Sequence, residues 1–249
     1  MEQCFFLGFE FPGGTCAQWF SGSASALAVA VAVSAHFYSA WRQRKADERD
    51  EAAEIAGISM LLRGIIDDAA TNASMFFGNF RIINLWGEKY VIGRRLGAVR
   101  AAQVSGLEKG QADVLLRSDQ VKLAENIDML VRRANLNNLG IEDYSSMREE
   151  LNELVLKHSA KLADIGNHVT PSSDDGKIIA AKMFSVSAAT ENFIRRTEEL
   201  LRMSIKAADD FNVFCSGNTN FTKYLIDVGG PAGLLRRMEK AAEAQGSAK

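Results

Sequence analysis

The feature that most constrains this chain is a stretch near its N-terminus, from Ala17 to Trp41, that contains no charged residue. As an α-helix, a stretch of this length would extend about 37 Å, which exceeds the roughly 30 Å hydrocarbon core of a bilayer. Aromatic residues flank the stretch, and amphipathic rings favour the headgroup regions on both sides of a membrane. The sequence therefore predicts a single transmembrane helix over residues 17–41.

The distribution of charge predicts the orientation of this helix. Glu2 and Glu10 are the only charged residues before this helix, whereas basic residues begin immediately after it. Because positive flanks stay in the cytoplasm, we expect residues 1–16 to be a short extracytoplasmic tail. The predicted location is the inner (cytoplasmic) membrane, crossed once, with the C-terminus in the cytoplasm. The lipid bilayer is thus an expected partner, and the predicted membrane interface consists of Trp19, Phe20, Trp41, Arg42, Arg44 and Lys45.

Two other interpretations of residues 17–41 stay open. A cleaved signal peptide also contains an apolar stretch, but its positive charge precedes that stretch, and here the order is reversed. A buried core helix is the stronger alternative, because the segment is rich in Ala and Ser rather than Leu and Ile. The small residues also allow close approach of two helices, so self-association in the membrane is a further expectation. Cys4 and Cys16 would lie outside, either as a disulfide or as free thiols.

The segment also carries a resemblance. Trp-Phe-Ser-Gly at residues 19–22 is followed by an Ala/Val run and then by Trp-Arg-Gln-Arg-Lys at residues 41–45. This succession resembles the leader of many uncharacterised single-pass membrane proteins of bacteria and their phages. The resemblance covers about 25 residues and implies a membrane topology, and no functional residue is carried over from it.

The rest of the chain predicts an all-α fold. The three prolines lie at positions 12, 171 and 231, which leaves a long interval open to helices. Residues that favour strands do not gather into alternating runs bounded by turns. We expect a helical stalk over residues 42–70, polar at first and then amphipathic, that enters a cytoplasmic helical bundle of long antiparallel helices over residues 71–245. A stalk continuous with the span would hold the bundle at a fixed offset from the membrane.

Within the bundle, two helices are predicted to form an antiparallel hairpin. The first covers residues 111–135, where Leu116, Leu123 and Leu130 recur at seven-residue intervals, as in a coiled coil. The second covers residues 145–165. The residues between them have side chains typical of turns, namely Asn135, Asn137, Asn138 and Gly140.

A polar break over residues 170–176 separates this hairpin from a longer predicted helix over residues 177–211. Ser173 or Asp174 is the expected N-cap of that helix, and Met183, Phe184 and Phe193 are expected to face inward. Residues 216–218 should end the helix, and residues 229–231 should open a last basic helix. Cys215 is expected to be a small buried residue.

The most aromatic part of the body lies at residues 75–86. It has two interpretations: the core where the first helix turns back, or a surface that contacts a partner or a membrane. The residues proposed for a partner surface are Phe76, Phe77, Phe80 and Trp86.

No catalytic signature is present, so the chain is not expected to be an enzyme or to use a cofactor. There is no phosphate-binding glycine loop and no His or Cys spacing typical of a metal site. From Arg42 onward the 29 basic residues are balanced by as many acidic ones, so no nucleic-acid partner is expected. Adjacent arginines could bind anions, but near acids or helix ends they are expected to be solvated surface: Arg94-Arg95, Arg132-Arg133, Arg195-Arg196 and Arg236-Arg237.

These patterns lead to one leading hypothesis and one alternative for function. The leading hypothesis is a membrane-anchored helical interaction, scaffold or sensing module that recruits a cytoplasmic protein partner or forms a homo-oligomer. The alternative is a membrane-active oligomeric effector, such as a pore or toxin, whose span self-associates.

Overall fold

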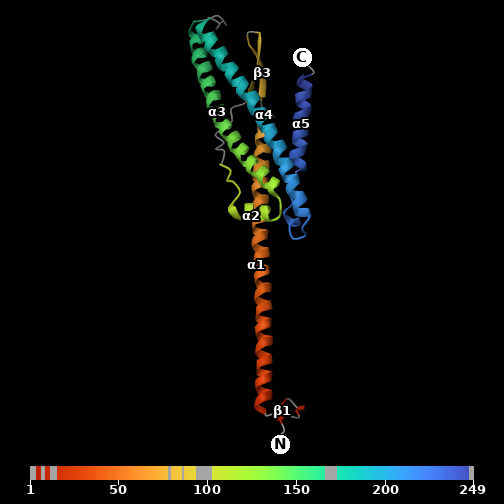
Figure 1. Cartoon of the computed structure of the whole chain (residues 1–249). Helices are drawn as coiled ribbons and strands as arrows, with labels where there is room; N and C mark the ends of the chain where they lie inside the picture. Colours follow the sequence, from red (N-terminus) through yellow and green to blue (C-terminus); the bar gives the residue numbers. More distant parts are fainter. Residues whose placement is uncertain are drawn as a thin grey trace. The chain divides into compact units, whose positions relative to one another are not determined.

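The computed structural model describes the backbone of residues 4–6, 9–11, 16–77, 80–85, 87–93, 103–165 and 173–246 (Figure 1). The described part of the protein is mostly helical, which confirms the predicted fold at this level. The chain divides into two compact units, Met1–Ala53 and Glu54–Lys249. Helix α1 (Cys16–Phe77) contributes residues to both units.

In the first unit, two short strands precede the helix. Strand β1 (Cys4–Phe6) pairs in antiparallel fashion with β2 (Phe9–Phe11). The predicted helix over residues 17–41 and the helical stretch over residues 42–70 both lie within α1. The uninterrupted helix agrees with the lack of proline between positions 12 and 171.

The second unit contains the remainder of α1, a hairpin and the other helices. The hairpin consists of β3 (Phe80–Leu85) and β4 (Glu88–Gly93). The helices are α2 (Lys109–Arg117), α3 (Val121–Ile165), α4 (Asp174–Ser216) and α5 (Gly229–Gly246), with a 3₁₀ turn, η1 (Thr222–Tyr224), before α5. Helices α3 and α4 run side by side (Figure 1).

Contacts along α3 and α4 show that they are antiparallel. Arg133 of α3 pairs with Glu199 of α4 at 2.9 Å, whereas Glu150, further along α3, pairs with Lys182, nearer the start of α4. The long antiparallel pair of the bundle is therefore α3 with α4.

The predicted pairing of residues 111–135 with residues 145–165 was wrong, because residues 121–165 form one continuous helix, α3, while residues 111–117 belong to α2. The break instead precedes α3, at residues 118–120, where Asp119 has a φ of 57°. The Asn-rich stretch continues the helix because its side chains bind other segments. Asn135 accepts a hydrogen bond from the Val104 amide at 2.8 Å and donates one to the Val104 carbonyl at 3.0 Å. Turn-forming side chains thus serve here as contacts between segments.

The β3–β4 hairpin is a second departure from the predicted all-α fold. Its register runs from Phe80 opposite Gly93 to Leu85 opposite Glu88, and Gly87 at the turn has a φ of 84°. In β3 the neighbouring residues Ile82 and Ile83 are both exposed, so this strand lacks the alternation that sequence analysis requires. Tertiary contacts hold the hairpin: the Val91 amide donates to Ser187 Oγ at 2.8 Å, and Arg148 Nε donates to the Gly93 carbonyl at 3.2 Å.

The ends of α4 and the start of α5 agree with the sequence. Ser173 is the N-cap of α4, and its hydroxyl accepts a hydrogen bond from the Gly176 amide at 3.0 Å. Helix α4 ends at Ser216, and α5 begins at Gly229. Met183 and Phe193 are buried as predicted, but Phe184 is exposed, because its position in the helical repeat faces away from α3.

Two apolar clusters form the core of the second unit. The larger one joins α1, α2, the first half of α3, the second half of α4 and the segments that follow, and includes Ile58, Leu130 and Phe211. The smaller one joins β4, the second half of α3 and the first half of α4, and includes Tyr144 and Phe193. Along α3 the stretch between the two clusters holds a buried polar residue, Asn137.

Candidate functional site

The first candidate site is the apolar surface of α1. Every side chain from Ser21 to Trp41 is exposed except that of Ala40, which is half-buried. Leu27 is 68% exposed and Phe37 is 70% exposed. By length and composition, α1 contains one stretch apolar enough to cross a membrane, and none of that stretch is buried. A core helix of a soluble protein would instead bury most of this surface.

The residues expected at the C-terminal interface of this stretch form a local cluster. The rings of Tyr38 and Trp41 lie 6.1 Å apart, and Lys45 Nζ lies 5.4 Å from the centre of the Trp41 ring. Arg42 and Arg44 occupy the same turn of α1 and are exposed. Helical spacing of four residues brings Trp41 and Lys45 together, as the sequence alone implies. The side chains of Trp19 and Phe20 lie outside the described part.

The expected partner surface falls largely on side chains that the structure does not describe. Phe76 and Phe77 end α1 and Phe80 begins β3, but their side chains and the whole of Trp86 lie outside the described residues. The neighbouring Ile82 is 53% exposed. Next to the hairpin lies a groove of about 490 Å³ whose walls come from β3, β4, α3 and α4, including Ile83, Ile92, Leu151, Val155 and Met183.

A third candidate site is a pocket of about 370 Å³ between α3 and α4. Its lining consists of Arg133, Leu136, Asn137, Arg196, Glu199 and Leu200. The Asn137 side chain is only 3% exposed, and its Oδ1 accepts a hydrogen bond from Thr197 Oγ1 at 3.4 Å. Its Nδ2 has no hydrogen-bond partner among the described residues. The pocket thus combines apolar walls with a buried donor that is unused within the described part.

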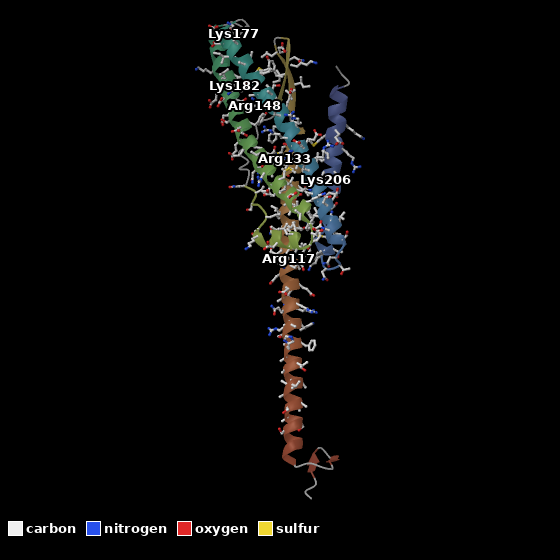
Figure 2. The ribbon with its side chains drawn as sticks, viewed as in Figure 1. Arg117, Arg133, Arg148, Lys177, Lys182 and Lys206 are labelled. Carbon is white, nitrogen blue, oxygen red and sulfur yellow. The ribbon has the colours of Figure 1, made fainter. Side chains whose placement is uncertain are left out.

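Two arginines carry the charge of this pocket. Arg133, labelled on the α3–α4 pair in Figure 2, forms an ion pair with Glu199 at 2.9 Å. Arg196 lies on α4, and its Nη1 is 4.0 Å from the place where a Cβ on Gly140 would lie. Since Gly140 is one turn beyond Asn137, the Arg196 guanidinium reaches α3 one turn from the residue with the buried amide. Arg196 forms no ion pair within the described residues, so the pocket carries a formal net charge of +1.

The remaining candidate residues divide into those that the structure describes and those that it does not. Cys215 is fully buried, as predicted, and burial raises the pKa of its thiol to about 11. Burial also raises the pKa of Tyr144, and burial together with the nearby Asp67 raises that of Asp68. Within the described part, no three His, Cys, Asp or Glu side chains gather as metal ligands. His168 and the side chains of Cys4, Cys16 and His158 lie outside that part.

Sequence analysis missed the α3–α4 pocket, although a signal for it was present. Buried residues of α3 continue the seven-residue interval beyond Leu130 to Asn137, Tyr144 and Leu151. Extending that interval would have placed Asn137 inside the bundle, where a polar residue needs a partner. The arginine pairs were expected to be solvated surface. Arg196 is indeed exposed and Arg133 is half-buried, and both also line this pocket.

The three sites differ in the chemistry that they offer. The α1 surface suits lipid, the hairpin groove suits an apolar side chain, and the α3–α4 pocket offers hydrogen-bond donors and positive charge. No protein-family model, curated protein or solved structure matches this chain.

Proposed function

We propose that this chain is a single-pass membrane protein whose cytoplasmic helical body is an interaction module that recruits a protein partner. The observation that carries the proposal is the continuous exposed apolar surface of α1 from Ser21 to Trp41. Exposed apolar surface of this extent is unfavourable in water, so a soluble protein would have to cover it. A bilayer would cover this apolar surface without a contact from another protein segment.

The flanking residues support the proposed orientation. Trp41 and Tyr38 have amphipathic rings suited to the headgroup region, and Lys45 lies against the Trp41 ring. Arg42, Arg44 and Lys45 follow the apolar stretch, whereas the preceding residues contain only acidic charges. This asymmetry favours an N-terminus outside and a body in the cytoplasm.

The groove beside the β3–β4 hairpin supports an interaction role for the body. Apolar residues from four elements line it, and Arg148 and Glu153 add polar groups to its walls. An apolar groove with a few polar groups is typical of surfaces that bind a partner. Of the expected aromatic residues, Phe76 and Phe77 precede this hairpin in the sequence, Phe80 begins it, and Trp86 lies between its two strands.

The first test is extraction of membranes with alkaline carbonate. The full-length protein should stay in the pellet, since an integral helix is removed only by detergent. Release into the supernatant would contradict the membrane-spanning part of the proposal, and the apolar surface of α1 would then have to be a protein interface.

Orientation can be tested with the native cysteines. A maleimide that cannot cross membranes should label Cys4 or Cys16 in intact cells after mild reduction of any disulfide. Cys215 should stay unlabelled, because it is buried and would lie on the cytoplasmic side. Labelling of the N-terminal thiols only after lysis would contradict the proposed orientation.

Recruitment can be tested with a photo-crosslinking residue at Ile82 in intact cells. A discrete heterologous adduct at Ile82, with none from the exposed control position Glu142, would support the interaction module. A ladder of multiples of the chain's own mass would instead support an oligomeric effector. Loss of membrane potential on expression would separate a pore from a non-conducting homo-oligomer.

A further inference from the structure

We propose that the pocket between α3 and α4 binds a small organic carboxylate, which accepts hydrogen bonds from the Asn137 amide and the Arg196 guanidinium. All six lining residues belong to the unit Glu54–Lys249. The inference goes beyond the proposed function and holds whether or not α1 spans a membrane.

The first argument is the unused donor of Asn137. Among the described residues, its Nδ2 is buried and has no hydrogen-bond partner, while its Oδ1 is bonded to Thr197. A buried polar group without a partner destabilises a fold, so such groups are rare in native proteins. Because Asn137 lines the pocket, an acceptor bound there would satisfy this donor.

The second argument is the charge around this donor. Arg196 reaches α3 near Gly140, one turn from Asn137, and has no ion pair within the described residues. The Arg133 charge is balanced by Glu199, so one uncompensated positive charge faces the pocket. A single carboxylate would neutralise it, and the planar guanidinium matches the two oxygens of a carboxylate.

The third argument is the size and lining of the pocket. Its volume of about 370 Å³ exceeds what one ion fills, and Leu136 and Leu200 add apolar surface beside the polar groups. A ligand with a short aliphatic part would contact these leucines while its carboxylate meets the donors. Small-molecule sites commonly combine apolar walls with a few convergent polar groups.

A purely structural role for Asn137 makes a different prediction. A single buried Asn can fix the register of two paired helices, and Asn137 occupies a core position of α3 opposite Thr197. That role needs only the bond to Thr197 and gives Arg196 no part. Binding of a carboxylate requires both Asn137 Nδ2 and Arg196, so changes at Arg196 separate the two roles.

The test is an NMR titration of the full-length protein in detergent micelles, with its asparagine side chains labelled with ¹⁵N. The Asn137 signals are identified by their loss in Asn137→Thr. Butyrate should shift them saturably, whereas butyramide and sodium chloride at matched ionic strength should not. N-acetyl-leucine represents the carboxylate at the end of a polypeptide. If N-acetyl-leucine binds more tightly than butyrate, the ligand is assigned to a chain terminus. If it binds more weakly, the ligand is assigned to a free small carboxylate.

Three substitutions at exposed positions keep the test independent of folding. Arg196→Gln should weaken butyrate binding at least about tenfold, because a charge-assisted hydrogen bond is lost. The matched control Arg195→Gln should bind butyrate normally, since Arg195 is paired with Asn192 and does not line the pocket. Glu199→Gln should strengthen binding, because Arg133 is then free to meet the ligand.

The proposal is overturned if butyrate gives no saturable shift, or if butyramide or chloride gives the same shift. Equal losses of binding in Arg196→Gln and Arg195→Gln would also overturn it, since the effect would then be general surface charge. Weaker binding in Glu199→Gln would contradict the assigned role of Arg133.

Discussion

At the scale of single residues, the effect of a substitution on stability depends more on the surroundings of the position than on the residue type. Gly57 and Gly64 are both glycines within α1, yet a Cβ on Gly57 would lie 2.4 Å from Gln111 Nε2, whereas a Cβ on Gly64 would meet nothing within 4 Å. Gln111 in turn holds the start of α2, because its Oε1 accepts a hydrogen bond from the Glu108 amide at 3.0 Å. Substitution by alanine should therefore stabilise the protein less at Gly57 than at Gly64.

We expect Gly64→Ala to stabilise the protein by about 0.5–1 kcal/mol, because alanine restricts the unfolded chain and favours a helix. Gly57→Ala should lower the free energy of unfolding relative to Gly64→Ala by at least about 1 kcal/mol, since Gln111 must move and its hydrogen bond to Glu108 is lost. Urea unfolding of both variants in detergent measures the difference. Equal stabilisation by the two substitutions would show that Gln111 adapts without cost.

Burial should make Cys215 unreactive in the folded protein. In a variant with Cys4→Ser and Cys16→Ser, Cys215 is the single thiol, and at pH 8 its labelling should be slow until urea unfolds the chain. Burial raises the pKa of this thiol from 9.0 to about 11. Between these two pH values the thiol therefore keeps its proton in the folded state and loses it in the unfolded state. Its contribution to stability is therefore present below pH 9 and is lost between about pH 9 and 11.

Cys215→Ala is the control for the pH dependence, since lysines and tyrosines also titrate in this range. The variant should lose less stability than the parent between pH 9 and 11. Rapid labelling of the folded protein at pH 8, or the same decline in both proteins, would contradict the burial of this thiol.

At the scale of elements, the β3–β4 hairpin depends on contacts with α3 and α4. Its strands form a two-stranded sheet, and such a hairpin is at best marginally stable by itself in water. Ser187 of α4 accepts the hydrogen bond of the Val91 amide, Arg148 of α3 binds the Gly93 carbonyl, and Tyr90 and Ile92 are buried in the smaller apolar cluster. The hairpin is therefore held by tertiary contacts more than by its own strand pairing.

Ser187→Ala should loosen the hairpin and leave the α3–α4 pair folded. The substitution leaves the Val91 amide without its acceptor, which costs about 1 kcal/mol, because this hydrogen bond is only partly buried. Hydrogen exchange of the β4 amides should accelerate, while that of the α3 and α4 core should change little. Ser185→Ala is the matched control, since Ser185 is exposed and, among the described residues, its hydroxyl donates to the Ala181 carbonyl of its own helix. Similar exchange in the two variants would show that Ser187 does not hold the hairpin.

At the scale of the whole molecule, the two units differ in where they leave apolar surface. In the unit Glu54–Lys249 one face of α1 buries apolar residues such as Ile55, Ile58 and Leu62, while Met60 on another face is exposed. In the unit Met1–Ala53 the described apolar side chains of the same helix are exposed, except those of Ala40 and Ala52, which are half-buried. One helix thus carries two kinds of surface, and the proposed bilayer would cover the surface that the second unit leaves out of its core.

A charge in the middle of the apolar stretch should therefore release the protein from the membrane. Val29→Lys places a charged group near the centre of residues 17–41, at a cost of about 2.5–3.5 kcal/mol for insertion. We expect a larger share of this variant in the supernatant after carbonate extraction, with Val29→Leu retained like the parent. Equal retention of the lysine variant would indicate that Val29 does not lie within the bilayer.

The sequence by itself determined the features that depend on local patterns. Runs without proline specified the long helix α1, Ser173 specified the start of α4, and Gly229 and Gly230 specified the start of α5. The uncharged stretch from Ala17 to Trp41 was evident from composition. These features follow from backbone sterics, capping and hydrophobicity, which act over a few residues.

Only the tertiary structure decided the features in which distant segments meet. Asn135 and Asn137 have side chains typical of turns, but contacts with Val104 and Thr197 keep them inside a helix. The hairpin likewise depends on Ser187, nearly a hundred residues away, and the α3–α4 pocket on Arg196. The intrinsic preference of such a residue for a turn over a helix is worth less than about 1 kcal/mol. A few tertiary hydrogen bonds and the burial of apolar neighbours contribute more than this. For that reason local patterns gave the ends of several helices, while packing between distant segments set the polar pocket and the hairpin.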